Sequence, residues 1–321
     1  MNTILLVKLS SLGDVIHNFP VATDLRARFP EATIHWVVEE QYGPLVALHP
    51  AVNRVIPIAL RRWRKSPLRT STWREFAAFR RELTATRYDA IIDTQGLLKS
   101  ALVARMARGP RHGFAKGSAR EPLASCFYDR DHDCPPGEHM LFRCRSLAAQ
   151  AAGYAIDTDR FDYGIRASAP PPAIVNGPYC VLFHSTARAS KLWPEERWIA
   201  LGNELARHGL RCVLPAGNAG ERARSERLAA AIPDAVVPAP LSIPEIAALI
   251  AGARVVIGVD TGLMHLAVAL SVPVAGLYCD SNPAEVGPIG PGPNVYRGGV
   301  GQPPTIGDAI AAVREVAPGL L

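Results

Sequence analysis

TILLVKLSSLGDVIHNFPVATDLRARF, at residues 3–29, decides the fold at the start of the chain. Thr3–Val7 is an unbroken apolar run, which is typical of a parallel strand covered by helices on both faces. From Val15 to Phe29 the apolar residues recur at helical spacing. Between these segments, KLSSLGD at residues 8–14 places an ammonium group, two hydroxyl groups, a glycine and a carboxylate where a strand gives way to a helix. α/β enzymes do their chemistry at such turns.

Asp14 lies near the expected first turn of this helix. The helix dipole favours a carboxylate there and keeps it ionised. One interpretation is that Asp14 only caps its helix, which is a common role for Asp at such a position. The other is that its carboxylate takes part in chemistry, and the pattern alone leaves both open.

The composition predicts a globular protein. A chain of 321 residues, 48% hydrophobic and 20% charged, is long enough for one large core or two of ordinary domain size. The sequence contains no apolar run of the length that crosses a membrane, and it begins on a strand-like segment without a basic leader. We therefore expect a cytosolic protein without a membrane span.

The six cysteines are scattered, and Cys180 and Cys212 lie in apolar strand-like runs, so we expect reduced thiols. Four potential metal ligands lie close together in the sequence: His132, Cys134, His139 and Cys144. Their spacing matches no finger or ribbon pattern, and the segment is a polar connection with two prolines. We expect no structural zinc there.

The formal charge of +6 is concentrated in one region, since residues 54–87 contain ten basic and two acidic side chains. The densest part, RRWRKSPLR at residues 61–69, contains Ser66 and Pro67 and is predicted to be a loop. Such a loop favours an anionic partner: nucleic acid, an acidic membrane surface, or a substrate with several carboxylates or phosphates. A solvated basic face is the simpler alternative. Nucleic acid is the weakest candidate, because no recognition-helix, aromatic-platform or finger pattern lies nearby.

Strand-like and helix-like segments alternate in two halves of the chain. In the first half, strands are expected at 3–7, 33–38, 54–58 and 88–93, with helices near 15–28, 72–86 and 97–107. In the second half, strands are expected at 179–184, 210–214, 254–259 and 273–278, with helices near 195–208, 221–231, 244–251 and 263–270. This alternation predicts an α/β protein with two Rossmann-like, doubly wound domains.

Between the halves, Ala167–Pro178 is rich in proline and small residues, as a linker is. We place the boundary there, between an N-terminal domain at 1–168 and a C-terminal domain at 169–321. The last helix of the chain could also pack back on the N-terminal domain. A cleft between two such domains is the expected active site.

The second half offers three turns that suit a phosphate ligand. In GVDTG at residues 258–262, a strand ends in Asp260, Thr261 and Gly262, and Thr261 is placed to cap the helix that follows. HSTARASK at 184–191 brings two hydroxyl groups and Lys191 to the loop before another helix. Many capped turns of this kind bind nothing.

The third turn is LPAGNAGERARS at residues 214–225, where Glu221 lies at a helix start. A carboxylate there can accept hydrogen bonds from a ribose diol, although helix capping explains it equally well. GNAG does not match the GxGxxG fingerprint, so a standard dinucleotide site is not expected.

Six motifs, in order along essentially the whole chain, together resemble the ADP-heptose:lipopolysaccharide heptosyltransferases of glycosyltransferase family 9. They are KLSSLGDVIH at residues 8–17, RRWRK at 61–65, IIDTQGLLKSA at 91–101, AREPLAS at 119–125, Lys191 before WPEE, and VDTGLMHLA at 259–267. Each motif alone is weak, whereas their joint occurrence is specific.

The resemblance implies a GT-B fold, with an N-terminal domain that receives the acceptor and a C-terminal domain that binds the nucleotide sugar. It implies transfer of L-glycero-D-manno-heptose, with inversion, from ADP-L-glycero-β-D-manno-heptose to the Kdo of Kdo2-lipid A in the lipopolysaccharide inner core. It also implies a cytoplasmic enzyme on the periphery of the inner membrane, with no metal or other cofactor and no nucleic-acid partner.

The site residues follow from the same resemblance. Asp14 matches the general base. The donor would be bound by Ser185, Thr186, Lys191, Glu221, Asp260, Thr261, Gly262 and His265, with Lys191 at the phosphates, Glu221 at the ribose and Asp260 at the heptose. The anionic acceptor would be bound by Lys8, Ser10, Arg61, Arg62, Arg64, Lys65 and Arg120.

Two alternatives stay open. The chain could be heptosyltransferase II or a related inverting sugar-nucleotide transferase, whose acceptor differs. It could also be a non-catalytic protein that binds a nucleotide or an anionic lipid. The latter would bind ADP-heptose without consuming it.

Overall fold

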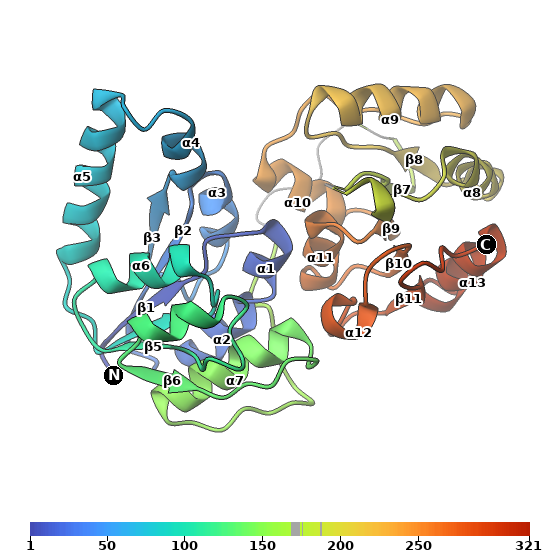
Figure 1. The fold of residues 1–321 in the computed structure, drawn as a ribbon. Coiled ribbons are helices and arrows are strands. Elements are labelled where there is room, and N and C mark those ends of the chain that lie inside the picture. The colour runs from blue at the N-terminus through green and yellow to red at the C-terminus, as the bar shows by residue number, and fades with distance from the viewer. Residues whose placement is uncertain (168–173, 175, 187) are drawn as a thin grey trace. The chain divides into compact units, whose positions relative to one another are not determined.

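The computed structural model describes residues 1–167, 174, 176–186 and 188–321. The chain forms two compact units, Met1–Ile165 and Arg166–Leu321 (Figure 1). Most of the expected linker, Ala167–Pro178, lies outside the described residues. Among the described residues, no helix has the length and apolar character needed to cross a membrane.

The first unit is built on a parallel sheet of six strands in the order β3-β2-β1-β4-β5-β6. The strands are β1 (Thr3–Val7), β2 (Thr33–Glu39), β3 (Arg54–Ile58), β4 (Ala90–Asp93), β5 (Arg111–Phe114) and β6 (Arg130–His132). β1 is central, because Leu5 pairs with His35 of β2 on one side and Ile91 of β4 on the other. This is the Rossmann order, whose switch point lies between β1 and β4.

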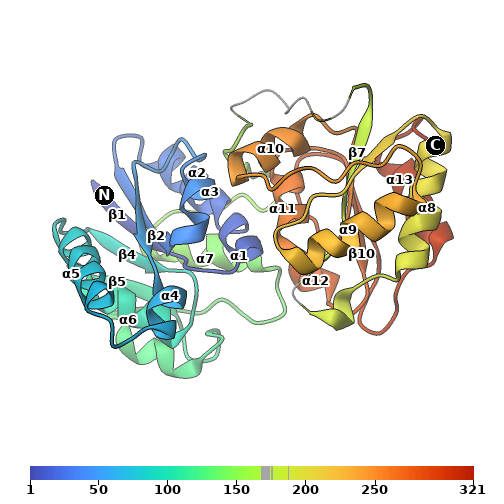
Figure 2. The same ribbon diagram turned by 90° about the horizontal axis from the view of Figure 1, so that it is seen from above.

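Helices cover both faces of this sheet (Figure 2). They are α1 (Leu12–Ile16), α2 (Phe19–Arg28), α3 (Gly43–Val46), α4 (Leu60–Lys65), α5 (Thr70–Thr84), α6 (Leu98–Met106) and α7 (Met140–Ala152), with short 3-10 turns η1 (Glu40–Tyr42) and η2 (Pro122–Phe127). Alternate residues of β1 face opposite layers. Leu5 and Val7 share a core with Phe79 of α5 and Val103 of α6. On the other face, α2 packs on α7.

The second unit has five parallel strands in the order β11-β10-β9-β7-β8. The strands are β7 (Tyr179–Phe183), β8 (Arg211–Val213), β9 (Val255–Val259), β10 (Val274–Tyr278) and β11 (Asn294–Gly298). In chain order this is a 2-1-3-4-5 arrangement, and its switch point lies between β7 and β9. The two adjacent strands pair from Cys180 with Val255 to Phe183 with Gly258.

The helices of the second unit are α8 (Glu195–Arg207), α9 (Ala219–Ala231), α10 (Ile243–Ala251), α11 (Gly262–Ala269), α12 (Pro283–Val286) and α13 (Ile306–Val316), with the 3-10 turn η3 (Ala189–Lys191). α13 packs on β10, β11 and α8. The packing that the structure describes for the last helix therefore lies inside the second unit.

The prediction of a loop at residues 61–69 is wrong for its first half, which is α4. Trp63 explains the difference, since its ring is buried against Phe76 and Phe79 of α5 and its indole N–H donates to Glu75. Ala59 and Leu60, at the start of this helix, pack on the same core. The helix ends at Lys65 with Ser66 as its C-cap residue, because Ser66 precedes Pro67 and a residue before a proline disfavours the helical conformation.

The single helix expected near 15–28 is two helices, α1 and α2. Pro20 lies in the first turn of α2, where its missing N–H costs nothing. The same proline could not lie in the interior of one continuous helix without a break. α1 is therefore short, and it places Asp14 in its own first turn.

Candidate active site

Asp14 lies at the carboxyl end of β1, next to the switch point of the first sheet. Its Oδ2 accepts hydrogen bonds from the backbone N–H of Ser11 at 3.0 Å and from the Ser11 hydroxyl at 3.1 Å. Its Oδ1 faces the guanidinium of Arg120 at 3.0 Å. Asp14 therefore caps its helix with one oxygen and presents the other to a cation, so the two interpretations of the sequence are compatible.

The Asp14 carboxylate is ionised at neutral pH. Burial raises its pKa, but the charges of Lys8 and Arg120 and the hydrogen bonds from Ser11 outweigh burial, and the pKa lies below its usual value. The side chain keeps 13% of its exposure and that of Arg120 keeps 42%. Asp14 can therefore be reached from solvent while it remains an anion.

Lys8 is buried, with only 1% of its surface exposed. Its ammonium donates to the Thr94 carbonyl oxygen at 2.7 Å and lies 3.6 Å from the Cys144 sulfur. In this position Lys8 acts on Asp14 through its charge and does not present its ammonium to a ligand in solvent. The acceptor contact that the resemblance implies for Lys8 stays a prediction.

The loop between Lys8 and Asp14 is held by residues that follow β4. The Gln95 side-chain oxygen accepts hydrogen bonds from the backbone N–H groups of Leu9 and Ser10 at 2.9 and 3.1 Å. Lys99 of α6 donates to the Ser10 hydroxyl at 3.0 Å. Gln95 and Lys99 belong to the IIDTQGLLKSA motif, but the sequence assigns them no role, because these contacts span 85 to 89 residues.

Asp93 ends β4 beneath this loop and is fully buried. It accepts hydrogen bonds from the Gln95 backbone N–H at 2.8 Å and from the Tyr128 hydroxyl at 2.9 Å. Burial raises its pKa to about 6, although these hydrogen bonds and the charge of Lys8 act in the opposite direction. Asp93 thus ties β4, Gln95 and the segment before β6 together below Asp14.

The basic residues of α4 lie on a helix. The Arg61 backbone N–H donates to Glu39, and Arg62 forms ion pairs with Glu40 and Glu75 at 2.9 and 2.8 Å. The side chains of Arg64 and Lys65 are exposed, and in the described part of the chain they pair with no carboxylate. The candidate acceptor residues therefore divide into a group beside Asp14 and a group on α4.

In the second unit, Asp260 follows β9 and Lys191 follows β7, so both lie at the switch point of the second sheet. The Asp260 Oδ2 accepts hydrogen bonds from the Lys191 ammonium at 2.5 Å and from the Ser281 hydroxyl at 2.6 Å. Its Oδ1 lies 3.7 Å from Nε2 of His265. Burial alone would raise the pKa of Asp260, but His265, Lys191 and Ser281 hold it well below its usual value. His265 thus has a place beside the carboxylate, which the sequence motif did not assign.

The hydroxyl groups of the 184–191 segment are held from two sides. Thr186 donates to the Asp260 carbonyl oxygen at 2.9 Å. The Ser185 hydroxyl lies 2.9 Å from Nδ1 of His184, and Nε2 of His184 lies 2.8 Å from the Ser225 hydroxyl. Burial lowers the pKa of His184 to about 4, so its ring is neutral and bridges the two serines. Ala187, within this segment, lies outside the described residues.

Thr261 is the N-cap residue of α11, and Gly262 is its first residue. The side chain of Thr261 makes no capping hydrogen bond, so the prediction that this hydroxyl caps the helix is not what the structure shows. The start of α11 therefore keeps backbone N–H groups and a hydroxyl group at the same edge as Asp260.

Glu221 lies in the first turn of α9. Its carboxylate accepts hydrogen bonds from the Gly217 backbone N–H and from the Asn218 side-chain amide, both at 2.7 Å. The Asn218 side chain in turn accepts from the Glu221 backbone N–H at 3.0 Å. Capping is therefore one role of Glu221, and the carboxylate still has lone pairs for a further donor such as a ribose hydroxyl.

The four potential metal ligands at residues 132–144 have separate partners. A ring nitrogen of His132 lies 3.0 Å from one of His112, the Cys134 sulfur accepts from the Gln150 side-chain amide at 3.6 Å, and the Cys144 sulfur lies 3.6 Å from the Lys8 ammonium. His139 caps α7 by accepting from the Leu141 backbone N–H. Within the described residues, no group of three or more potential ligands could hold a metal ion.

Two parallel sheets with polar residues gathered at their switch points agree with solved heptosyltransferases. The structure of Escherichia coli heptosyltransferase WaaC with ADP matches with a TM-score of 0.91 and 40% identity, covering 98% of this chain and 100% of that chain. The same protein with ADP-2-deoxy-2-fluoro heptose matches with a TM-score of 0.87 and 38% identity, covering 98% of this chain and 99% of that chain. The fold is therefore GT-B, a glycosyltransferase architecture, as the sequence predicts.

The sequence comparisons define the family. The profile of glycosyltransferase family 9 (heptosyltransferase) matches residues 76–307. A lipopolysaccharide heptosyltransferase 1 of Pseudomonas aeruginosa is 44% identical over 288 residues, which cover 89% of this chain and 81% of that protein. Lipopolysaccharide heptosyltransferase 2 of Salmonella typhimurium is 25% identical over 324 residues, which cover 92% of this chain and 87% of that protein. The chain belongs to glycosyltransferase family 9 and is a heptosyltransferase.

Proposed function

We propose that this enzyme transfers L-glycero-D-manno-heptose from ADP-L-glycero-β-D-manno-heptose to a Kdo hydroxyl of Kdo2-lipid A, with inversion at the anomeric carbon. The observation that carries the proposal is the arrangement at the two switch points. One has an ionised, reachable carboxylate, Asp14, beside Arg120. The other has Lys191, Asp260 and the start of α11 together. The first arrangement suits an acceptor and the second a nucleotide sugar.

The donor is assigned to the second unit on chemical grounds. Diphosphate oxygens suit the Lys191 ammonium, the hydroxyl groups of Ser185 and Thr186 and the N–H groups at the start of α11. Asp260 can accept hydrogen bonds from sugar hydroxyls, and Glu221 from a ribose diol. The solved complexes of the Escherichia coli relative with ADP and a fluorinated ADP-heptose support a donor of this class.

In the transfer step, Asp14 accepts the proton of the attacking Kdo hydroxyl. The oxygen forms a bond to the anomeric carbon from the face opposite the diphosphate, and the bond from that carbon to the phosphate oxygen breaks with its electron pair. ADP leaves with an additional negative charge, which Lys191 and the α11 N–H groups stabilise. An ordinary Asp is a weak base, so proton transfer accompanies the attack and does not precede it.

The acceptor is an anionic lipid, and we place the enzyme at the cytoplasmic face of the inner membrane. The exposed cations Arg64 and Lys65 and the Arg120 guanidinium beside Asp14 are suited to its carboxylates and phosphates. The alternative acceptor, one that already carries a heptose, is less well supported, since identity to a heptosyltransferase 2 is 25% against 44% to a heptosyltransferase 1.

The test is a mass assay. The protein is incubated with ADP-heptose and Kdo2-lipid A, and the lipid is expected to gain the mass of one heptose, with and without a chelator. A parallel reaction offers an acceptor that already carries one heptose. Product only from this second acceptor would replace the proposed acceptor, and loss of product with the chelator would overturn the metal-independent mechanism.

A further inference from the structure

The exposed apolar side chains of the first unit are concentrated on one layer. Apart from Met1, the large hydrophobic residues at its surface are Leu68, Trp73, Leu102 and Leu123, which are 94%, 62%, 49% and 65% exposed. They lie after α4, on α5, on α6 and on η2. These elements cover the same face of the sheet, because α4 and α5 pack through Trp63 and Phe79, α5 packs on α6, and α6 packs on η2. We call the outer surface of these four elements the basic outer face.

The charged side chains of the basic outer face that lack an ion-pair or hydrogen-bond partner in the described residues are cations. Its exposed cations include Arg64, Lys65, Arg69, Arg74, Arg80 and Arg81. Its carboxylates are already engaged: Glu75 with Arg62, Glu82 with Arg54, and Glu121 with the backbone N–H of Leu98 at the start of α6. A partner therefore meets cations and apolar side chains without an opposing free carboxylate from these three residues.

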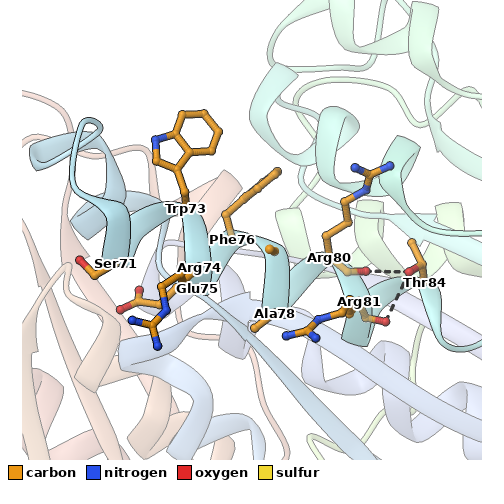
Figure 3. Close-up of a pocket in the computed structure, with 10 residues that line it drawn as sticks. Ser71, Trp73, Arg74, Glu75, Phe76, Ala78, Arg80, Arg81 and Thr84 are labelled. Atoms are coloured by element: carbon orange, nitrogen blue, oxygen red, sulfur yellow. Dashed lines mark hydrogen bonds between the residues drawn. The ribbon is translucent and has the colours of Figure 1, made fainter.

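The outward side of α5 combines both features. A surface hollow of about 1420 Å³ runs along this helix and is lined by Trp73, Phe76, Arg74, Arg80 and Arg81 among others (Figure 3). In Figure 3, Trp73 and Arg80 point to one side of the helix, and Arg74 and Arg81 point to another. An exposed indole ring flanked by guanidinium groups is the combination found where a protein rests in the headgroup region of a bilayer.

We propose that the basic outer face docks the enzyme on an anionic lipid bilayer, with Trp73 and Leu68 inserted among the headgroups and the surrounding arginines on lipid phosphates. Protein interfaces are enriched in arginine and aromatic residues, but their cores are depleted of charge and lysine is depleted in them, whereas here a dense set of exposed cations that includes Lys65 is interleaved with the apolar residues. This mixture favours a bilayer over a protein partner. The inference rests on the proposed function, since a lipid-linked acceptor requires the enzyme to work at a membrane.

The basic outer face is continuous with the Asp14 site. Arg120, the ion-pair partner of Asp14, immediately precedes Glu121 and η2. Lys99 of α6 donates to Ser10 in the loop that carries Asp14. A lipid headgroup held against α6 and η2 therefore lies next to the residues that surround the proposed base, and the acceptor need not leave the bilayer surface.

The experiment measures binding of the full-length protein to vesicles by co-sedimentation. Vesicles of phosphatidylethanolamine with phosphatidylglycerol are compared with vesicles of phosphatidylcholine. The variant Arg74→Gln/Arg80→Gln is expected to bind the anionic vesicles at least about tenfold more weakly, because each cation near such a surface contributes about fivefold to binding. The matched control, Arg254→Gln/Arg314→Gln, removes two exposed arginines from the second unit and is expected to bind like the wild type.

A second measurement follows Trp73 directly. Brominated lipids are expected to quench the fluorescence that is lost in the Trp73→Phe variant, and Leu68→Ser is expected to weaken vesicle binding. The proposal is overturned if the Arg74/Arg80 variant binds like the wild type, or if vesicle charge has no effect. It is also overturned if the wild type is a dimer that Trp73→Ser converts to a monomer, since a second copy would then cover this face.

A soluble, deacylated Kdo acceptor separates this inference from the proposed function. With it, the docking variants are expected to keep the wild-type kcat/KM, whereas with acceptor in vesicles their KM rises. Vesicle binding without transfer to any acceptor by the wild type would sink the proposed function and leave the docking face standing. Transfer of heptose by a wild-type protein that binds no vesicles would overturn the docking face and leave the proposed function standing.

Discussion

The two switch points hold their aspartates in different ways. Asp14 shares its carboxylate between a helix cap and an ion pair with Arg120, whose side chain is 42% exposed. Asp260 is surrounded by Lys191, Ser281 and His265, and its own backbone carbonyl oxygen accepts from Thr186. An ion pair with an exposed partner is worth little and opens easily, whereas a buried network of charges resists change. Asp14 is suited to exchange a proton, and Asp260 to position a ligand.

Replacement of Asp14 should have the largest effect on rate. Asp14→Asn keeps the shape of the side chain but cannot accept the proton, so kcat should fall by about 10² to 10⁴. Binding of ADP-heptose should be unchanged, because the donor site is assigned to the second unit. Steady-state kinetics and calorimetric titration of the donor measure the two quantities.

Asp308 offers a matched control for the cap. It occupies the same N3 position in α13 and accepts from the Thr305 backbone N–H and hydroxyl at 2.8 and 2.7 Å, as Asp14 does from Ser11. Asp308→Asn therefore removes an equivalent cap away from the switch points and should leave kcat unchanged. Near-normal turnover in Asp14→Asn would remove Asp14 from the role of base and leave it as a cap alone.

Lys191→Ala should have the next largest effect. It removes the cation that we propose stabilises the departing diphosphate, and kcat/KM for ADP-heptose should fall by about 10² to 10³. Lys191→Arg keeps the charge with a different shape and should recover part of the loss. The control Lys116→Ala removes an exposed lysine from the first unit and should have no effect. Equal kcat/KM in Lys191→Ala and Lys116→Ala would contradict the assignment of the phosphates to Lys191.

The sequence predicts the strands well and some of the helices poorly. β1 has the predicted bounds because a buried parallel strand is a continuous apolar run with a clear beginning and end. β3 also has the predicted bounds, although only Ile56 and Ile58 of its residues are buried. β5, β6 and β11 were not predicted. β6 and β11 contain no buried residue, and β5 has the sequence RHGF, which is not an apolar run. The prediction of a loop fails for α4 because the contacts that fix this short helix, those of Leu60 and Trp63 with the core, give no periodic signal over six residues.

The site residues also divide into those that the local sequence predicts and those that it does not. Asp14, Lys191 and Asp260 each follow a predicted strand, so their places were predictable from local sequence. Gln95, His184 and Ser281 were not predicted, because each acts on a residue brought to it by the fold. His184 reaches Ser225 across 41 residues and Ser281 reaches Asp260 across 21. The burial of Lys8 was equally hidden, since only the packed structure shows where a lysine side chain ends.

Substitution of His184 tests whether the hydroxyl groups of the proposed donor site must be held by hydrogen bonds, as Asp260 is. In His184→Gln the side-chain nitrogen can replace Nε2 toward Ser225 but not Nδ1 toward Ser185. In His184→Asn the reverse holds. We expect kcat/KM for the donor to fall by about tenfold in the Gln variant, in the range of one buried hydrogen bond, and by less in the Asn variant. Equal losses in both variants would assign His184 a packing role only.

Arg120→Gln should give the smallest effect on kcat and the clearest view of Asp14, and the loss of this cation should also raise KM for the anionic acceptor. Arg120 is one of the charges that hold the pKa of Asp14 below its usual value against the effect of burial, so its removal should raise that pKa. The base is active as an anion, and the acid limb of the kcat/KM profile should therefore move to higher pH. Because Arg120 is partly exposed, salt screens its charge, and the shift between wild type and variant should shrink as ionic strength rises.

Arg108→Gln, which changes an exposed arginine away from Asp14, serves as the control. An acid limb that stays in place in Arg120→Gln would mean that Lys8 and the Ser11 hydrogen bonds suffice to keep Asp14 ionised, and that the exposed ion pair contributes nothing to the base.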